Sequence, residues 1–360
     1  MMHYGIKHTI PGETKPFHSL RPYNYAFGIN LNRNSNLDQN NGFPQAGSNF
    51  MIRHHSVTKT QLFLFILPLL LSSCIPGSYK KSTNPEFSFG VLTDVQYCDC
   101  EPRNDRYYRN ALAKFEESVR ELNSKDLAFT IQLGDIIEKD FASFDQVLPI
   151  YDQLVMPKYH VLGNHEFSVS QEKKSAVLDK IGLENPYYDF RVKGWRFVVL
   201  DGNDISTYRV PQNSEAYQKA KAKLEELQDQ GLPNAQKFNG ALGDQQMSWL
   251  RNTLNQACTA GEKVILFCHH PVFPRNTNTL WNDTEVMNLI ESHNCVVAYI
   301  NGHYHPGNYQ KKNGIHYLTL QGMVDTVDKN AYAIIEVYPD RLEVVGYGRE
   351  PSRTLYFPNK

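Results

Sequence analysis

Five apolar segments of this chain each end in residues that can bind a metal ion, and this recurrence constrains the fold more than any other feature. The segments span residues 87–93, 128–133, 159–162, 263–268 and 296–300. They end in Asp94-Val95-Gln96, Gly134-Asp135, Gly163-Asn164-His165, His269-His270-Pro271 and Gly302-His303-Tyr304-His305. Ligand sites in open α/β sheets lie at the carboxyl ends of strands, so these side chains are expected to converge. A turn explains any one motif alone, but not the ordered recurrence of all five.

Helical periodicity separates the apolar segments and predicts an α/β fold. Apolar residues recur at helical spacing over 106–123, 143–155, 214–230, 244–257 and 285–293. Further strands are expected at 188–192, 196–201, 315–320, 331–338 and 341–347. This alternation predicts one domain over residues 87–350, with two sheets inside, helices outside and a tail at 351–360.

The residue types at the five strand ends suit a pair of metal ions. Two cations about 3.5–4 Å apart can clamp a phosphate and activate water. Such a pair needs a carboxylate shared by both ions, and Asp135 is the candidate. Mixed oxygen and imidazole ligands favour manganese, iron or zinc over magnesium or calcium. Gly134, Gly163 and Gly302 are expected to allow the tight turns that bring the backbone close to the ions.

The ordered set Asp-x-Gln, Gly-Asp, Gly-Asn-His, His-x-Pro and Gly-His-x-His resembles the calcineurin-like metallophosphoesterase superfamily. The resemblance covers most of residues 87–348 and implies a four-layer α/β/β/α sandwich of two mixed sheets flanked by helices. Most of that superfamily has Asp-x-His as its first motif. Gln96 instead resembles the manganese-dependent ADP-ribose/CDP-alcohol diphosphatase family, as do residues 89–97, 106–110, 132–137, 163–167, 238–240 and 280–282.

This resemblance implies a ligand set for two divalent metal ions, Mn²⁺ first, with iron or zinc as alternatives. One ion would be bound by Asp94, Gln96, Asp135 and His305, and the other by Asp135, Asn164, His269 and His303. The Gln96 amide oxygen is a weaker donor than imidazole, so we expect it to loosen its ion. His270 is expected to lie behind the ligands, because the superfamily spacing His-x-Pro makes His269 the ligand.

Catalytic and substrate-binding roles follow from the same resemblance. His165 is expected to protonate the leaving oxygen or to stabilise developing charge. The guanidinium groups of Arg106 and Arg109 suit a diphosphate, although surface ion pairs would explain them equally well.

The better-known relatives carry a longer loop, with a base-stacking aromatic residue, where this chain has only residues 98–105. Phe238 or Trp281 is expected to take the place of that aromatic residue, with Tyr97 as an alternative.

The front of the chain has the features of an export signal. Residues 1–50 are polar and lack periodicity, so they are interpreted as a disordered or non-native leader, with Met51 as the true start. A basic segment, the apolar run 62–71 and Ser72-Ser73-Cys74 then follow in the order of a signal peptide over 51–74. A buried core helix is the alternative.

Leu71 to Cys74 also resembles a bacterial lipobox, so Cys74 is expected to carry lipid, with residues 75–86 as a tether. The prediction is therefore an exported, membrane-anchored bacterial lipoprotein on the periplasmic or cell-surface side.

Charge and cysteine content narrow the partners. The formal net charge of −1 gives no overall field that favours nucleic acid, so no nucleic-acid partner is expected. The family resemblance implies a small nucleoside diphosphate-linked molecule as the partner. The six cysteines suggest no paired framework and no zinc-binding pair. Cys98 and Cys100 are interpreted as loop or core thiols, with a redox role as the alternative.

The leading hypothesis is thus a metal-dependent ADP-ribose/CDP-alcohol diphosphatase that releases a nucleoside monophosphate. The alternatives are an exported phosphodiesterase or phosphomonoesterase that scavenges phosphate, and a membrane-anchored binding protein without catalysis.

Overall fold

The structure, a computed structural model, describes residues 82–358. The predicted leader (1–50), the signal peptide (51–74) with Cys74, and most of the tether (75–86) lie outside these residues. Within the described part of the chain, no helix is both long and apolar enough to cross a membrane.

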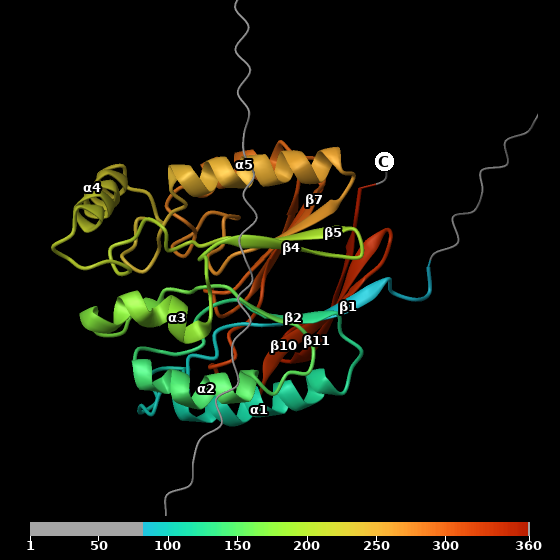
Figure 1. Cartoon of the computed structure of the whole chain (residues 1–360), viewed down its shortest axis with the longest axis horizontal. Coiled ribbons are helices and arrows are strands. Elements are labelled where there is room, and N and C mark those ends of the chain that lie inside the picture. Colours follow the sequence, from blue (N-terminus) through green and yellow to red (C-terminus); the bar gives the residue numbers. More distant parts are fainter. Residues whose placement is uncertain (1–81, 359–360) are drawn as a thin grey trace, which may run out of the picture. The chain divides into compact units, whose positions relative to one another are not determined.

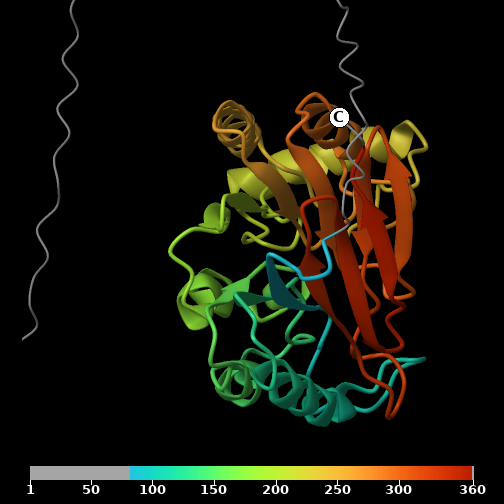
Figure 2. The same cartoon turned by 90° about the vertical axis from the view of Figure 1, so that its right-hand side faces the viewer.

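The described chain contains two sheets of six strands each. The first sheet has the order β12 (Arg353–Tyr356), β11 (Arg341–Gly348), β10 (Ala331–Val337), β1 (Phe87–Leu92), β2 (Phe129–Gln132), β3 (Lys158–His160). The second has the order β4 (Tyr188–Val192), β5 (Trp195–Val199), β6 (Lys263–Phe267), β7 (Val296–Asn301), β9 (Ile315–Thr319), β8 (Asn308–Lys312). Each sheet mixes parallel and antiparallel pairs. Figure 2 shows β11 and β10, in red, side by side, and β10 is the strand that pairs with β1.

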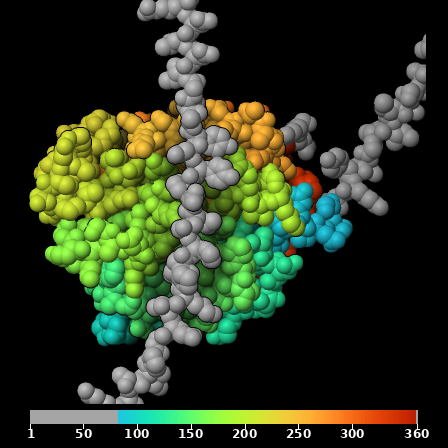
Figure 3. Space-filling model, viewed as in Figure 1, coloured from blue at the N-terminus to red at the C-terminus, as the bar shows by residue number. Residues whose placement is uncertain are grey.

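Helices cover the outer faces of both sheets and complete four layers (Figure 1). The helices α1 (Tyr108–Asn123), α2 (Phe144–Tyr151) and α3 (Val177–Ile181) lie on the side of the first sheet. The helices α5 (Asp244–Thr259) and α6 (Asp283–Glu291) pack on the second sheet, and α4 (Glu215–Asp229) has a small apolar cluster of its own. In Figure 3, α4 lies at the left-hand end of the visible face. The predicted sandwich is therefore confirmed.

A group of phenylalanines joins the two sheets. Phe89 and Phe129 come from the first sheet, Phe197 and Phe267 from the second, and all four are fully buried. The Phe89 ring centroid lies 4.7 Å from that of Phe129 and 5.6 Å from that of Phe197. Aromatic pairs at these separations add to the stability of a buried core. The packing fixes the two sheets against each other and therefore fixes the relative positions of the strand ends.

Two short strands were not expected from the sequence. The β8 sequence, Asn-Tyr-Gln-Lys-Lys, is polar because this strand forms an edge of the second sheet. The strand β12 pairs with β11 at an edge of the first sheet, so the folded domain extends into the predicted tail. Neither strand has more than one fully buried side chain, so neither shows the apolar pattern of a core strand.

The prediction about the cysteines is wrong in the described residues. A disulfide joins Cys258, in α5, to Cys295, which immediately precedes β7, and a second joins Cys98 to Cys100. Cys268 is a buried free thiol. The Cys258–Cys295 pair was missed because the partners are 37 residues apart and only the fold brings them together.

Candidate metal centre

The structure brings all the predicted metal ligands to the carboxyl ends of five strands, three from the first sheet and two from the second. Asp94 follows β1, Asp135 follows β2 and Asn164 follows β3, whereas His269 follows β6 and His303 follows β7. All seven predicted ligands are buried: Asp94, Gln96, Asp135, Asn164, His269, His303 and His305.

Four of these ligands have a backbone conformation that is uncommon for residues other than glycine. Their φ angles are +51° at Asp94, +43° at Gln96, +57° at Asp135 and +68° at His303. Backbone strain of this kind persists where the surrounding structure enforces it, and it clusters at functional sites. The positive φ angles are therefore evidence, independent of the residue types, that these turns form a functional site.

Glycines make the turns possible by leaving room for the ligands. Gly134 has φ +95°, and a Cβ atom there would lie 2.7 Å from His269 Nδ1 and 2.7 Å from the Gly163 nitrogen. A Cβ on Gly163 would collide with Asp135, and one on Gly302 with Thr93. The predicted role of these glycines in close backbone approach thus has a steric basis.

Asp135 lies at the centre of the cluster. Its Oδ2 is 3.1 Å from His269 Nε2 and accepts a hydrogen bond from Gln96 Nε2 at 3.2 Å. Its Oδ1 accepts the backbone N–H of His165 at 2.8 Å. Asp135, His269 and His303 form a group whose ligand atoms lie within 4.8 Å of one another. This central position suits a carboxylate that is shared between two cations.

The remaining ligands extend the cluster on both sides of Asp135. His303 Nδ1 lies 3.1 Å from His269 Nε2, and His305 Nε2 lies 3.3 Å from Asp94 Oδ1. Nitrogen and oxygen atoms that can bind a cation therefore face one another across a narrow space.

Three buried oxygens in this cluster have no hydrogen-bond partner: Asp94 Oδ1, Gln96 Oε1 and Asn164 Oδ1. Leaving such a group unsatisfied costs about 1–3 kcal/mol, and more if it is charged. All three are acceptors, and each belongs to a predicted ligand. Divalent cations supply what these atoms lack, so the donor set fits two metal ions.

Electrostatics point the same way. Burial acts to raise the pKa of the Asp135 carboxyl, but the nearby His269 holds it well below its usual range. Burial acts to lower the pKa values of His269 and His305, but Asp135 and Asp94, respectively, raise each to about 9. Protons thus sit where cations would bind, and metal binding to such a site releases them.

The three histidines predicted as ligands are each oriented by a second contact. His269 Nδ1 donates to the Leu133 carbonyl at 2.8 Å, which leaves Nε2 free toward Asp135. His303 Nε2 lies 3.0 Å from Asn239 Oδ1, and His305 Nδ1 lies 2.8 Å from Asp325 Oδ1. Partners of this kind fix the ring tautomer and orientation of metal-binding histidines.

Asn239 and Asp325 were not identified from the sequence. Asn239 lies within a segment already singled out by resemblance, whereas no local pattern marks Asp325.

Glu166 is another functional residue that was missed. Its carboxylate accepts the backbone N–H groups of Asp135, Ile136 and Gly163, at 3.0, 2.6 and 2.8 Å. It therefore ties the second and third ligand turns together. Burial, reinforced by Asp135, raises the pKa of Glu166 to about 7.

His165 lies next to the ligands with its ring held in place. Its Nδ1 donates to the Glu138 carbonyl at 2.7 Å, and its Nε2 lies 3.9 Å from Asp135 Oδ2. Burial opposes protonation, but Asp135 and Glu138 raise the pKa of His165 to about 9. An imidazole in this environment carries a proton that it can donate.

A cavity of about 210 Å³ opens over the cluster. It is lined by Gln96, Arg106, Asp135, Asn164, His165, Phe238, Asn278, His303 and His305. Phe238 is 42% exposed, and its ring centroid lies 5.7 Å from that of His303. The cavity therefore combines ligands, a cation and an exposed aromatic ring.

Arg109 and Trp281 lie outside the lining of this cavity. Arg109 forms ion pairs with Asp99 at 2.5 Å and with Glu101 at 2.8 Å. Trp281 is buried, and its indole N–H donates to the Gln236 carbonyl at 3.0 Å. The position of the Arg109 side chain is explained by its surface ion pairs. The position of Trp281 is explained by its packing beneath residues 236–240. Neither placement supports a substrate contact.

His270 lies behind the ligands, in contact with the loop that carries Phe238. Its Nε2 donates to the Phe238 carbonyl at 3.4 Å. Burial and the neighbouring His269 lower its pKa to about 3. His270 is therefore a neutral donor that supports the rim of the cavity.

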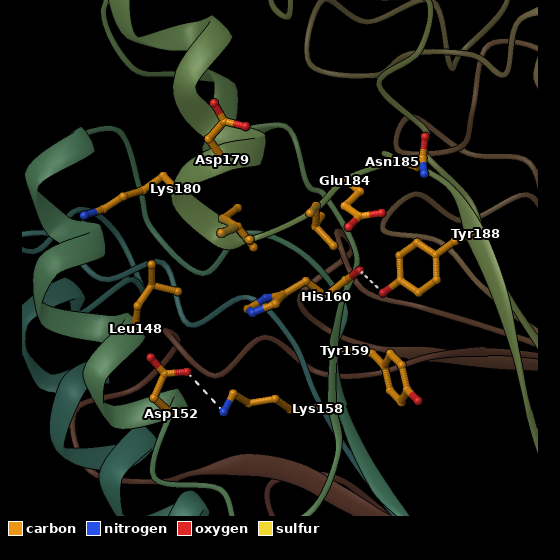
Figure 4. Close-up of a pocket in the computed structure, with 13 residues that line it drawn as sticks. Leu148, Asp152, Lys158, Tyr159, His160, Asp179, Lys180, Glu184, Asn185 and Tyr188 are labelled. Atoms are coloured by element: carbon orange, nitrogen blue, oxygen red, sulfur yellow. Dashed lines mark hydrogen bonds and ion pairs between the residues drawn. The ribbon is translucent and has the colours of Figure 1, made fainter. Parts of the chain in front are cut away.

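A roomier hollow, of about 630 Å³, lies elsewhere (Figure 4). It is formed by α2, α3, β3 and the start of β4, and shares no residue with the cavity over the ligands. In Figure 4, Tyr188 donates to the His160 carbonyl and Lys158 pairs with Asp152. Cavity volume does not identify the functional site here, because the cluster of predicted ligands and its unsatisfied oxygens lie at the smaller cavity.

Comparisons with known proteins agree with this geometry. The family model described as calcineurin-like phosphoesterase matches residues 87–307. A manganese-dependent ADP-ribose/CDP-alcohol diphosphatase from Mus musculus is 30% identical, over 79% of this chain and 97% of the relative. One from Arabidopsis thaliana is 33% identical, over 74% of this chain and 96% of the relative. The crystal structure of a dimetal phosphatase from Danio rerio superposes with a TM-score of 0.69 and 29% identity, over 76% of this chain and 100% of the other.

Proposed function

This chain belongs to the calcineurin-like phosphoesterase family, and from that premise we propose that it hydrolyses nucleoside diphosphate-linked compounds such as ADP-ribose or CDP-alcohols. The products would be a nucleoside monophosphate and a phosphorylated fragment. The observation that carries the proposal is the set of three unsatisfied ligand oxygens beneath a cavity that also presents Arg106 and Phe238. This chain matches the diphosphatase relatives over nearly their whole lengths, and the names of these relatives support the proposed substrate class.

We propose Mn²⁺ as the physiological metal, with Asp94, Gln96, Asp135 and His305 at one ion and Asp135, Asn164, His269 and His303 at the other. The relatives are named as manganese-dependent, and the mixed oxygen and imidazole donors suit that metal. When bound, the two cations would neutralise phosphate charge and activate water for attack on phosphorus.

The side chains around the cavity have complementary roles in this proposal. The Arg106 guanidinium binds the phosphate that leaves, because its fork of donors matches two phosphate oxygens. His165 holds a proton at Nε2, on the cavity side, and donates it to the leaving oxygen. The exposed Phe238 ring stacks on the base, in place of the aromatic residue absent from the short loop 98–105.

A substrate panel with Mn²⁺ tests this function. The purified protein is assayed with ADP-ribose, CDP-choline, bis(p-nitrophenyl) phosphate and p-nitrophenyl phosphate. Turnover of the first two, with AMP and CMP as products, is the expected result. Absence of turnover with all four would contradict an enzymatic role and would favour the binding protein.

A second candidate function is phosphate scavenging outside the cytoplasm by a phosphodiesterase or phosphomonoesterase. Two disulfides in the described residues favour it, because disulfides persist mainly in oxidising compartments. Efficient turnover of only the two p-nitrophenyl esters would select this function over the first.

The same disulfides support the proposal of an exported lipoprotein anchored through Cys74. The charge, apolar and small-residue order of residues 51–74 is its main support. Mass spectrometry of the native protein is expected to find a lipid-modified Cys74 at the mature N-terminus. A mature start upstream of Met51 would contradict the proposal.

A further inference from the structure

The loop between β9 and β10 contacts the ligand turns of both sheets. The Gly322 N–H donates to the His305 carbonyl at 3.1 Å. The next two N–H groups, of Met323 and Val324, donate to the carbonyls of Thr93 and Asp94 at 3.1 and 2.9 Å. One segment thus holds the turn that carries Asp94 against the turn that carries His305.

This loop also directs a carboxylate at His305. Asp325 Oδ1 accepts the Nδ1–H of His305 at 2.8 Å. A carboxylate can only accept, so one proton is placed on Nδ1, and Nε2, which lies 3.3 Å from Asp94 Oδ1, is the ring nitrogen left for a cation. The contact therefore determines which ring nitrogen is available to a cation.

A buried lysine supports the loop from below. Lys114, in α1, is 4% exposed, and its Nζ donates to the carbonyls of Met323, Asp325 and Thr326 at 2.5, 3.0 and 2.9 Å. Asn330 closes the loop by donating to the Lys114 carbonyl at 2.7 Å. A lysine is rarely buried unless its charge is well satisfied. The three carbonyls satisfy the charge of Lys114, and the hydrogen bonds in turn hold the loop against α1.

A second cation, Arg349, lies near the Asp325 carboxylate oxygen that does not face His305. Arg349 Nη2 is 3.9 Å from Asp325 Oδ2 and also donates to the Gly322 carbonyl. The Asp325 side chain is therefore held between a cation and the histidine that it orients.

We infer that Asp325 is a positioning residue for the metal ion bound by His305, and that Lys114 holds the loop which presents Asp325. The inference rests on the two-metal function proposed above. Its consequence is selective: loss of Asp325 weakens one of two sites, because the partners of His269 and His303 are Leu133 and Asn239.

Titration with MnCl₂ alone, followed by the electron paramagnetic resonance of free Mn²⁺, tests the inference without any substrate. The wild-type chain is expected to bind two ions. Asp325→Ala is expected to weaken one site about 10–100-fold and to leave the other unchanged. Asp325→Asn keeps an acceptor for the Nδ1–H of His305, so its loss of Mn²⁺ affinity is expected to be smaller. Lys114→Met is expected to weaken the same site and to lower the melting temperature in EDTA.

The matched control is Asp328→Asn, which removes an exposed carboxylate from the same loop and is expected to bind as wild type. Two sites of wild-type affinity in Asp325→Ala would overturn the inference, as would equal weakening of both sites. If Asp325→Ala does not fold, wild-type affinity at both sites in Asp325→Asn and Lys114→Met would overturn it. A wild-type chain that binds no Mn²⁺ would instead overturn the proposed function itself.

Discussion

At Gln96 the metal site presents an amide oxygen where most of the superfamily has an imidazole. Gln96 Oε1 is buried without a hydrogen-bond partner, and the residue is held at φ +43°. Replacing it by histidine is expected to tighten one Mn²⁺ site about tenfold, which corresponds to about 1.4 kcal/mol. The measurement is hydrolysis rate against free Mn²⁺, where Gln96→His should saturate at lower concentration. An unchanged or higher Mn²⁺ requirement would show that Gln96 does not loosen the site.

His165 is the residue to which we assign proton donation. His165→Ala is expected to lower kcat about 10²–10⁴-fold, the usual contribution of general acid catalysis. Mn²⁺ binding should be retained, because His165 is not among the proposed ligands. His293→Ala, which removes a histidine outside the cavity, is the control and should keep full rate. Full rate in His165→Ala would remove this residue from catalysis.

At the residue scale, sequence patterns identified the side chains that cluster at the strand ends better than the residues that orient them. Asp94, Asp135 and His269 lie in short motifs beside apolar strands. Asp325 and Asn239 contact their histidines only because the fold brings distant turns together. The contact of Asp325 leaves no local signature in a single sequence, and the segment 238–240 marks Asn239 without indicating that it orients a histidine.

Among the elements, α5 is linked by a disulfide to Cys295, the residue just before β7, and removal of this link has a measurable consequence. It closes a loop between Cys258 and Cys295, 37 residues apart, so its removal is expected to cost about 3–4 kcal/mol of unfolding free energy. Chemical denaturation of Cys258→Ser/Cys295→Ser, compared with the wild type under oxidising conditions, measures this loss. A reductant should lower the unfolding free energy of the wild type by breaking this disulfide, whereas the variant has no Cys258–Cys295 bond to lose. Equal stability of variant and wild type would contradict the disulfide.

Helices and central strands were predictable from sequence because they bury regular apolar faces. In α1, for example, Ala111, Phe115, Val119 and Leu122 all lie on the buried face. The strands β8 and β12 were not predictable, because each pairs with one neighbour and buries few side chains, so no apolar pattern marks it.

For the molecule as a whole, acid is expected to destabilise the fold through His160. Burial lowers the pKa of His160 to about 4; Lys158 adds to this effect and Asp152 opposes it. Between pH 6.5 and 4 the unfolded chain binds a proton that the folded chain does not, so stability falls as pH falls. From pH 7 to pH 5 the loss from this residue is about 2 kcal/mol.

Urea denaturation at pH 7 and pH 5 measures that loss. His160→Gln is expected to lose about 2 kcal/mol less than the wild type between the two pH values. The same pH dependence in both proteins would show that His160 is not buried as a neutral ring.

Anomalous diffraction from crystals grown with Mn²⁺ would locate the metal ions themselves. Two manganese peaks about 3.5–4 Å apart are expected, with the Asp135 carboxylate between them. Gln96 and His305 should lie beside one peak, and Asn164 and His303 beside the other. A single peak, or peaks away from these residues, would contradict a two-metal phosphoesterase built on these strand ends.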